Sequence, residues 1–128
     1  RFGFHLRIAC PAGFEPVPEV RANAGALAEV FTDPVAAVEG ADLVVTDVWT
    51  SMGQEDDMAG RRDVFSAYQV NAGLMRHAAD GAIFMHCLPA HRGEEVTDDV
   101  IDGPQSVVWD ESENRMHTQA ALLEMLLG

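Results

Sequence analysis

Basic residues are scarce in this chain. Its 128 residues include 8 Lys plus Arg against 21 Asp plus Glu, a formal net charge of −13. This negative field repels phosphate backbones and therefore disfavours nucleic-acid binding through a basic patch. It would attract a cationic small molecule, although we expect most of the acidic residues to form solubilising surface. We predict no nucleic-acid partner, and the charge alone identifies no ligand.

Cysteines and long apolar runs are also few. Cys10 and Cys87 are the only cysteines, and they form neither a CxxC pair nor the dense even set of a disulfide framework. Residues 1–10 alternate charged and apolar groups without the apolar core of a signal peptide. No stretch approaches the ~20 apolar residues of a membrane span. We therefore expect a reducing, cytoplasmic setting and no membrane partner.

The chain does contain enough apolar material for one core, since 48% of its residues are hydrophobic. Short apolar runs alternate with segments of helical composition. Strands are predicted at 4–9, 28–32, 42–47, 82–85 and 106–109, helices at 18–27, 34–39, 71–79, 97–101 and 111–127, and a loop at 48–62. This alternation predicts an α/β fold, a Rossmann-like parallel sheet with helices on both faces.

Local signals support parts of this assignment. Residues 42–47 are β-branched and apolar through the middle, as buried parallel strands are, so we place this strand centrally in the sheet. Asp33 is expected to cap the helix that Pro34 begins, and Thr97 to cap the helix at 97–101. In parallel sheets ligands bind beyond the carboxyl ends of the strands, so the residues that follow strands are the candidate site.

Three segments in such positions are chemically unusual. After the strand at 42–47 come Asp47, Ser51 and a loop with Gly53, which could hold an ammonium group through a carboxylate and a hydroxyl. The alternative is that Asp47 caps the loop and Ser51 faces water, and the pattern alone favours this alternative. The second segment is His86 to Gly93, with Cys87 at a strand end.

In an extended chain His86 and Cys87 point to opposite sides, so we do not expect them to pair as base and nucleophile. Their spacing to His91 is also poor for a metal site, and a buried Cys is more often core than chemistry. The third segment, Asp110 to Thr118, is predicted to open the last helix. Its acids suit the helix dipole, whereas Arg115 opposes it and indicates an anionic or carbonyl-bearing ligand.

Together these segments resemble the carbamoyltransferase family, and specifically its ornithine branch. The resemblance is carried by Asp-x-x-x-Ser-Met-Gly at 47–53, His-Cys-Leu-Pro at 86–89 and Glu-Asn-Arg-x-His at 113–117, with Tyr-Gln-Val-Asn at 68–71 and Leu-Met at 74–75. The match spans nearly the whole chain in the family's order. Aspartate carbamoyltransferases lack the Ser-Met-Gly loop, so the resemblance implies ornithine as substrate.

The resemblance implies transfer of a carbamoyl group from carbamoyl phosphate to the δ-amine of L-ornithine, giving L-citrulline and phosphate. Asp47 and Ser51 would bind the α-ammonium end of ornithine, and Met52 would meet its carboxylate through the backbone. Cys87 and Leu88 would lie at the reacting centre, and a cis Leu88–Pro89 bond would turn the Leu88 carbonyl toward substrate. Arg115 would polarise the carbamoyl oxygen. Cys87 and Arg115 are thus the catalytic candidates, and no metal or organic cofactor is implied.

The family's phosphate-binding Ser-x-Arg-Thr motif and its His-Pro-x-Gln segment are absent from these 128 residues. We therefore expect residues 1–128 to be an incomplete, C-terminal ornithine-binding domain of a longer enzyme, which would be a homotrimer with an N-terminal carbamoyl-phosphate domain. The alternative is a remnant that only binds an amino acid or packs against a partner. Asp47, Cys87 and Arg115 are predicted to converge at one edge of the sheet.

Overall fold

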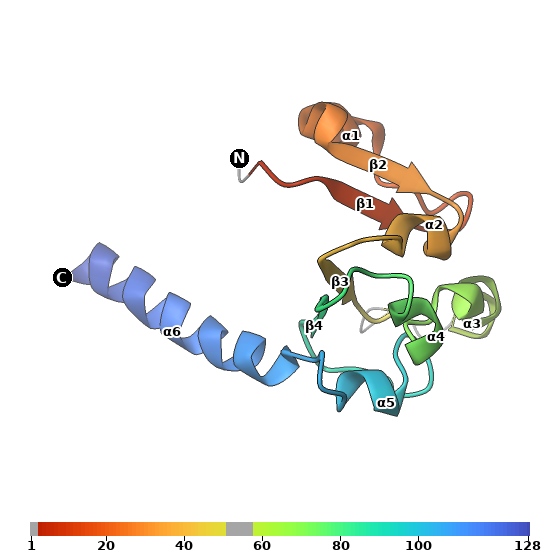
Figure 1. Ribbon diagram of the computed structural model, residues 1–128. Helices are drawn as coiled ribbons and strands as arrows, with labels where there is room; N and C mark the ends of the chain where they lie inside the picture. Colours follow the sequence, from red (N-terminus) through yellow and green to blue (C-terminus); the bar gives the residue numbers. More distant parts are fainter. Residues whose placement is uncertain (1–2, 51–57) are drawn as a thin grey trace.

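The structure is a computed structural model that describes residues 3–50 and 58–128 (Figure 1). Its strands are β1 (Leu6–Ala9), β2 (Ala28–Phe31), β3 (Leu43–Thr46) and β4 (Ile83–His86). Its helices are α1 (Pro18–Ala24), α2 (Pro34–Val38), α3 (Met58–Phe65), α4 (Ala72–Met75), α5 (Asp98–Ile101) and α6 (Val108–Leu127), with 3-10 turns η1 (Gly25–Leu27) and η3 (Ser66–Tyr68).

The strands form two parallel pairs, so the predicted α/β class is confirmed. β1 pairs with β2, with Leu6 opposite Ala28, and β3 pairs with β4, with Thr46 opposite His86. The central position predicted for β3 is wrong for the described part of the chain, where β4 is its only partner strand. β1 and β3 instead line one groove of about 880 Å³, which extends to Asp47. In the described residues the two pairs are separate sheets, without a ladder between β1 and β3.

The core lies around β4, where α4, α5 and the start of α6 meet the β3–β4 pair. Phe84, Val96 and Val108 are completely inaccessible to solvent, and each comes from a different segment. The buried cluster consists of Val38, Val44, Val70, Leu74, Met75, Phe84, Val96, Val100, Ile101 and Val108. This core fixes the carboxyl end of β4, from which the candidate site residues continue.

Of the two predicted helix caps, Asp33 is confirmed and Thr97 is wrong. Asp33 caps α2 as predicted, because its Oδ1 accepts a hydrogen bond of 2.9 Å from the Val35 N–H. Thr97 does not cap α5 through its side chain. Its hydroxyl donates instead to the Val70 carbonyl oxygen at 3.5 Å, a contact between distant segments that no local pattern indicates.

The strand predicted at 106–109 is wrong. Ser106 makes a single bridge to Phe84, and the chain then turns into α6, whose first closing bond runs from the Glu111 N–H to the Val107 carbonyl. A short apolar run has no periodicity that separates a strand from a buried helical turn. The last helix therefore begins at Val108, and Arg115 lies two turns inside it rather than at its amino end.

Two further boundaries differ from the prediction. The predicted loop at 48–62 contains the start of α3, at Met58. The helix predicted at 71–79 ends at Met75, because the backbone then continues in turns closed by His77 N–H to Leu74 and Ala78 N–H to Met75. Asn71, which accepts from the Leu74 N–H at 3.0 Å, begins this short helix.

α6 extends away from the rest of the molecule, with its carboxyl end far from the strands (Figure 1). Val108 is its only buried residue. Its large apolar side chains are exposed, among them Trp109, Met116, Leu122, Leu123, Met125, Leu126 and Leu127. Exposed apolar surface of this extent marks a site of interaction with another surface.

Candidate functional site

Asp47 and Cys87 lie side by side at the carboxyl edge of the β3–β4 pair. The register places Thr46 opposite His86, so the residues that follow leave the two strands together. The Cys87 thiol donates a hydrogen bond to Asp47 Oδ1, with an Sγ–Oδ1 distance of 3.2 Å. Parallel pairing thus brings together two side chains that are 40 positions apart in sequence.

The carboxylate of Asp47 has one oxygen available for a ligand. Oδ1 accepts from the Val48 N–H at 2.8 Å as well as from Cys87. Oδ2 makes no hydrogen bond to any other residue within 3–50 and 58–128, and the side chain is exposed. A carboxylate held through one oxygen can accept a charge-assisted hydrogen bond from an ammonium group through the other.

Arg115 reaches the same edge from α6. Its NH1 group donates to the Cys87 carbonyl oxygen at 3.1 Å, and the side chain is exposed. α6 packs against β4, which brings this position of the helix over the end of the strand. The predicted convergence of Asp47, Cys87 and Arg115 is therefore confirmed.

His86 and Leu88 flank Cys87 on the inner side of the chain. His86 is completely buried whereas Cys87 is exposed, which confirms that they point to opposite sides. The Leu88–Pro89 bond is cis, as predicted, and Leu88 has a φ of 54°. Of the other predicted substrate residues, Ser51 and Met52 lie outside the described residues.

The environment of Cys87 disfavours its thiolate. Cys87 is exposed as a residue, but partial desolvation by its neighbours raises the pKa of its thiol, and the hydrogen bond to Asp47 and the charges of Asp47 and Glu111 raise it further. A thiol with a raised pKa is a poor nucleophile near neutral pH, because the thiolate is the reactive form. The geometry therefore favours Cys87 as a hydrogen-bonding group rather than as a covalent nucleophile.

This raised pKa gives a measurable prediction. In a Cys10→Ala background, Cys87 should react with iodoacetamide more slowly than a small free thiol at pH 8. Its rate should still be rising with pH where the free thiol has reached its plateau. Asp47→Asn should move the midpoint to lower pH, since it removes the carboxylate charge. The same chain unfolded in urea serves as the control, and a midpoint below that of the unfolded chain would contradict the assignment.

Glu111 and Glu95 both form hydrogen bonds with His86, next to Cys87. The sequence analysis predicted neither contact. Glu111 was assigned only to the helix dipole, yet its Oε2 accepts from the His86 N–H at 3.0 Å. Glu95 is completely buried and its Oε1 lies 3.2 Å from His86 Nε2. Glu95 lies among charged and polar residues from His91 to Asp99, so nothing in the sequence indicates that it is buried or that His86 is its partner.

Two groups of side chains could in principle offer ligand atoms to a metal ion. The ligand atoms of Asp47, His86 and Cys87 lie within 4.8 Å of one another, as do those of His91, Glu94 and Glu95. Both groups already use these atoms in hydrogen bonds, because Cys87 is bonded to Asp47 and Glu94 to Arg62. In the second group Glu95 Oε2 has no hydrogen-bond partner among the described residues, and it lies 4.0 Å from His91 Nδ1.

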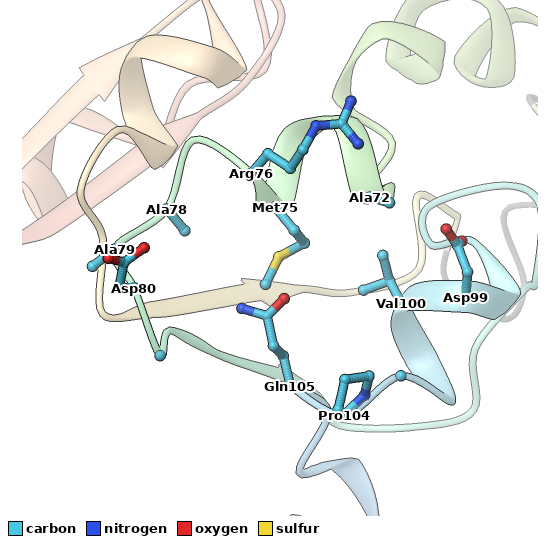
Figure 2. A pocket seen from close by; sticks show the side chains of 12 residues that line it. Ala72, Met75, Arg76, Ala78, Ala79, Asp80, Asp99, Val100, Pro104 and Gln105 are labelled. Carbon is cyan, nitrogen blue, oxygen red and sulfur yellow. The ribbon is translucent and has the colours of Figure 1, made fainter.

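A second cavity, of about 370 Å³, lies between α4 and α5 and contains none of the predicted site residues (Figure 2). Met75, Val100 and Gln105 line it together with the charged side chains of Arg76 and Asp80 (Figure 2). No group of side chains in it matches a nucleophile, a base and a charge-stabilising group in mutual contact. The carboxyl edge of the strands is therefore the better candidate site.

Comparison with known proteins identifies the family. Residues 1–126 match the family model described as aspartate/ornithine carbamoyltransferase, Asp/Orn binding domain. The chain belongs to the aspartate/ornithine carbamoyltransferase family. The ornithine carbamoyltransferase of Methylococcus capsulatus is 63% identical over 124 residues, which are 97% of this chain and 42% of that protein. The anabolic ornithine carbamoyltransferase of Pseudomonas aeruginosa is 58% identical over 127 residues, 99% of this chain and 42% of that protein.

Solved carbamoyltransferase structures share the fold. The ornithine carbamoyltransferase from Pyrococcus furiosus superimposes with a TM-score of 0.84 at 52% identity, over 94% of this chain and 41% of that one. The enzyme from Thermus thermophilus gives a TM-score of 0.87 at 40% identity, over 98% of this chain and 40% of that one. The chain thus spans about two fifths of the length of the relatives that it matches. Among the described residues, no helix has both the length and the apolar character that crossing a bilayer requires.

Proposed function

We propose that this chain is the ornithine-binding, C-terminal part of an ornithine carbamoyltransferase. The reaction would be carbamoyl phosphate plus L-ornithine giving L-citrulline plus phosphate. One observation carries the proposal: Asp47, Cys87 and Arg115 meet through hydrogen bonds at the carboxyl edge of parallel strands. They do so in a chain that is 52–63% identical to curated proteins named ornithine carbamoyltransferase.

Asp47 is proposed to bind the α-ammonium group of ornithine. Its free Oδ2 is the acceptor for this group, and the hydrogen bonds from Val48 and Cys87 to Oδ1 hold the carboxylate in place. Ser51 and the backbone at Met52 are proposed to complete the contacts to the amino-acid end. The excess of negative charge favours the approach of a cationic substrate.

Arg115 is proposed to act on the other reactant. In a tetrahedral transition state the carbamoyl oxygen becomes negative, and a guanidinium group that stays charged at all relevant pH values stabilises it. The δ-amine of ornithine, with an unperturbed pKa of about 10, must lose a proton before it attacks. The Leu88 carbonyl and the Cys87 thiol, next to the Arg115 contact, are proposed to orient this amine.

The remaining contacts to carbamoyl phosphate are proposed to come from an N-terminal domain of the same enzyme. The exposed apolar side chains of α6 support a partner surface of this kind, since they would otherwise face water. We further propose a homotrimeric, cytoplasmic enzyme without metal or organic cofactor. The alternative of a non-catalytic amino-acid-binding or partner-packing remnant is less well supported, because the proposed binding and charge-stabilising groups occur together.

The proposal is tested with the full-length protein that contains this chain. Citrulline formation should be observed with ornithine as acceptor, and aspartate should give no carbamoylated product. Product would be followed by colorimetry and confirmed by mass spectrometry. Ornithine binding without turnover would support the binding remnant instead, and carbamoylation of aspartate would refute the substrate assignment.

Substitution of Asp47 should separate its role from a general effect of charge. In the full-length enzyme Asp47→Ala should raise KM for ornithine by about 10–10²-fold, since a hydrogen bond to a charged group contributes about 1.5–3 kcal/mol. KM for carbamoyl phosphate should change little. Asp42→Ala is the matched control, because Asp42 is also exposed and lies at the opposite end of the same strand. An equal effect of both substitutions on ornithine would contradict the contact.

A further inference from the structure

The proposed site is supported from inside by a pair of buried polar side chains. His86 and Glu95 have no solvent-accessible surface, and they are the only buried polar or charged residues in the described part of the chain. His86 is the last residue of β4, and Glu95 lies in the segment before α5. Their side chains meet at 3.2 Å between His86 Nε2 and Glu95 Oε1. Neither residue is assigned a contact with substrate in the proposed reaction.

The hydrogen bonds around His86 determine which nitrogen carries the proton. The Leu88 N–H points at His86 Nδ1 over 2.9 Å, and a backbone N–H can only donate. Nδ1 must therefore be unprotonated, and the neutral ring carries its proton on Nε2. Nε2–H donates to Glu95 Oε1, which also accepts from the His91 N–H at 2.6 Å. An imidazolium would place a proton on Nδ1 against the Leu88 N–H.

His86 Nδ1 accepts from the N–H of Leu88, a residue in an unfavourable backbone conformation. Leu88 has a φ of 54°, in the left-handed region that side chains other than glycine rarely adopt. The neighbouring Cys87 carbonyl is bonded to Arg115 on the exposed side, and the His86 N–H is bonded to Glu111. The backbone from 86 to 88 is thus held by Glu111 and Arg115 of α6 and by the buried pair.

We infer that Glu95 and His86 are positioning residues, in which Glu95 fixes the Nε2–H tautomer of His86 so that Nδ1 holds the Leu88 N–H. This inference rests on the proposed function, since the position that it fixes is that of the Cys87 thiol and the Leu88 carbonyl toward ornithine. The pair is a fixed support and passes no proton to or from Cys87. The carboxylate of Glu95 is needed as an acceptor, not as a charge.

Substitutions in the full-length enzyme test this distinction. Glu95→Gln keeps an accepting oxygen for His86 and His91. Its amide nitrogen replaces Oε2, which has no hydrogen-bond partner in the described residues and lies 4.0 Å from His91 Nδ1. This variant should retain most of kcat. Glu95→Leu removes the acceptor and should lower kcat on the order of 10²-fold, the effect of a misplacement of about 1 Å, with little change in the Kd for carbamoyl phosphate.

Three further variants keep the test independent of folding defects. His86→Asn places an amide oxygen near the position of Nδ1 and should retain more activity than His86→Leu. Glu94→Leu is the matched control, one position along the chain, and should leave kcat within about threefold of the wild type. If Glu95→Gln is as slow as Glu95→Leu, the negative charge itself is required and the inference is wrong.

Neutron diffraction from the deuterated enzyme gives a readout that does not depend on activity. We expect deuterium on His86 Nε2 and none on Nδ1. Deuterium on Nδ1 would overturn the inference even if every variant behaved as expected. If instead the enzyme carbamoylates no ornithine, the proposed function fails, while the neutron density still decides how His86 is protonated.

Discussion

Purified on its own, the 128-residue chain is expected to form no detectable citrulline from ornithine and carbamoyl phosphate. The full-length enzyme that contains it should turn over under the same conditions. The reason is the donor, whose phosphate group carries nearly two negative charges, while this chain has a net charge of −13. Without groups that hold the phosphate, the two reactants are not brought together, and most of the advantage of a shared site is lost.

The arginines near the candidate site are too few to hold the phosphate of the donor. Arg92, which follows the Cys87 segment, donates to Asp98 at 2.8 Å and makes two hydrogen bonds to Asp102. These carboxylates neutralise its charge, so it offers no cation to a phosphate. Arg115 is then the one arginine bonded to the Cys87–Asp47 group in the described residues. A single exposed arginine does not replace the helix amino end and cluster of donors that usually bind a phosphate.

The measurement needs a host strain without its own carbamoyltransferase, so that no full-length enzyme contaminates the sample. Calorimetry on the same sample should find at most weak ornithine binding and no binding of carbamoyl phosphate. Mixing the chain with a separately produced N-terminal part is the informative control, since restored turnover would show that the chain itself is competent. Turnover by the chain alone would refute the proposal that two domains share the reaction.

Asp47 and Cys87 could be predicted as site residues because each directly follows a strand that is recognisable in the sequence. Asp47 and Cys87 each follow an apolar strand, and parallel strands place such positions at one edge. The role of Arg115 was predicted on a premise that the structure corrects, because α6 begins at Val108 and the residue is two turns from the amino end. Its location next to Cys87 depends on the packing of α6 against β4, which no local signal specifies.

The fold was predictable where local preference and packing agree. The β-branched residues of β3 and the Asp33–Pro34 cap specify their elements without help from distant contacts. At Val107–Trp109 the apolar run fits a strand as well as a buried turn of helix, and only the packing of Val108 into the core selects the helix. Glu95 escaped prediction for the same reason, since its partners His86 and His91 are defined by tertiary structure.

Substitution of Arg115 gives the second large effect that we expect. In the full-length enzyme Arg115→Ala should lower kcat by about 10²–10³-fold, the usual cost of removing one donor to a developing oxyanion. The loss should fall mainly on kcat, because the guanidinium interacts most strongly when the carbamoyl oxygen has become negative. Arg115→Lys should recover only part of the rate, since an ammonium group keeps the charge but loses the planar pair of donors.

Arg76→Ala is the matched control, because Arg76 is also an exposed arginine and lines the cavity between α4 and α5 (Figure 2), whose lining includes neither Cys87 nor Arg115. It should leave both kinetic constants nearly unchanged.

Arg115 also donates to the Cys87 carbonyl, so Arg115→Ala removes a backbone contact as well as a charge. Added guanidinium ion separates the two causes, since it can restore the charge in the vacated space but cannot restore the backbone. Partial rescue of kcat by guanidinium in Arg115→Ala would support direct stabilisation of the oxyanion. A raised KM with unchanged kcat would show that Arg115 contributes only to binding.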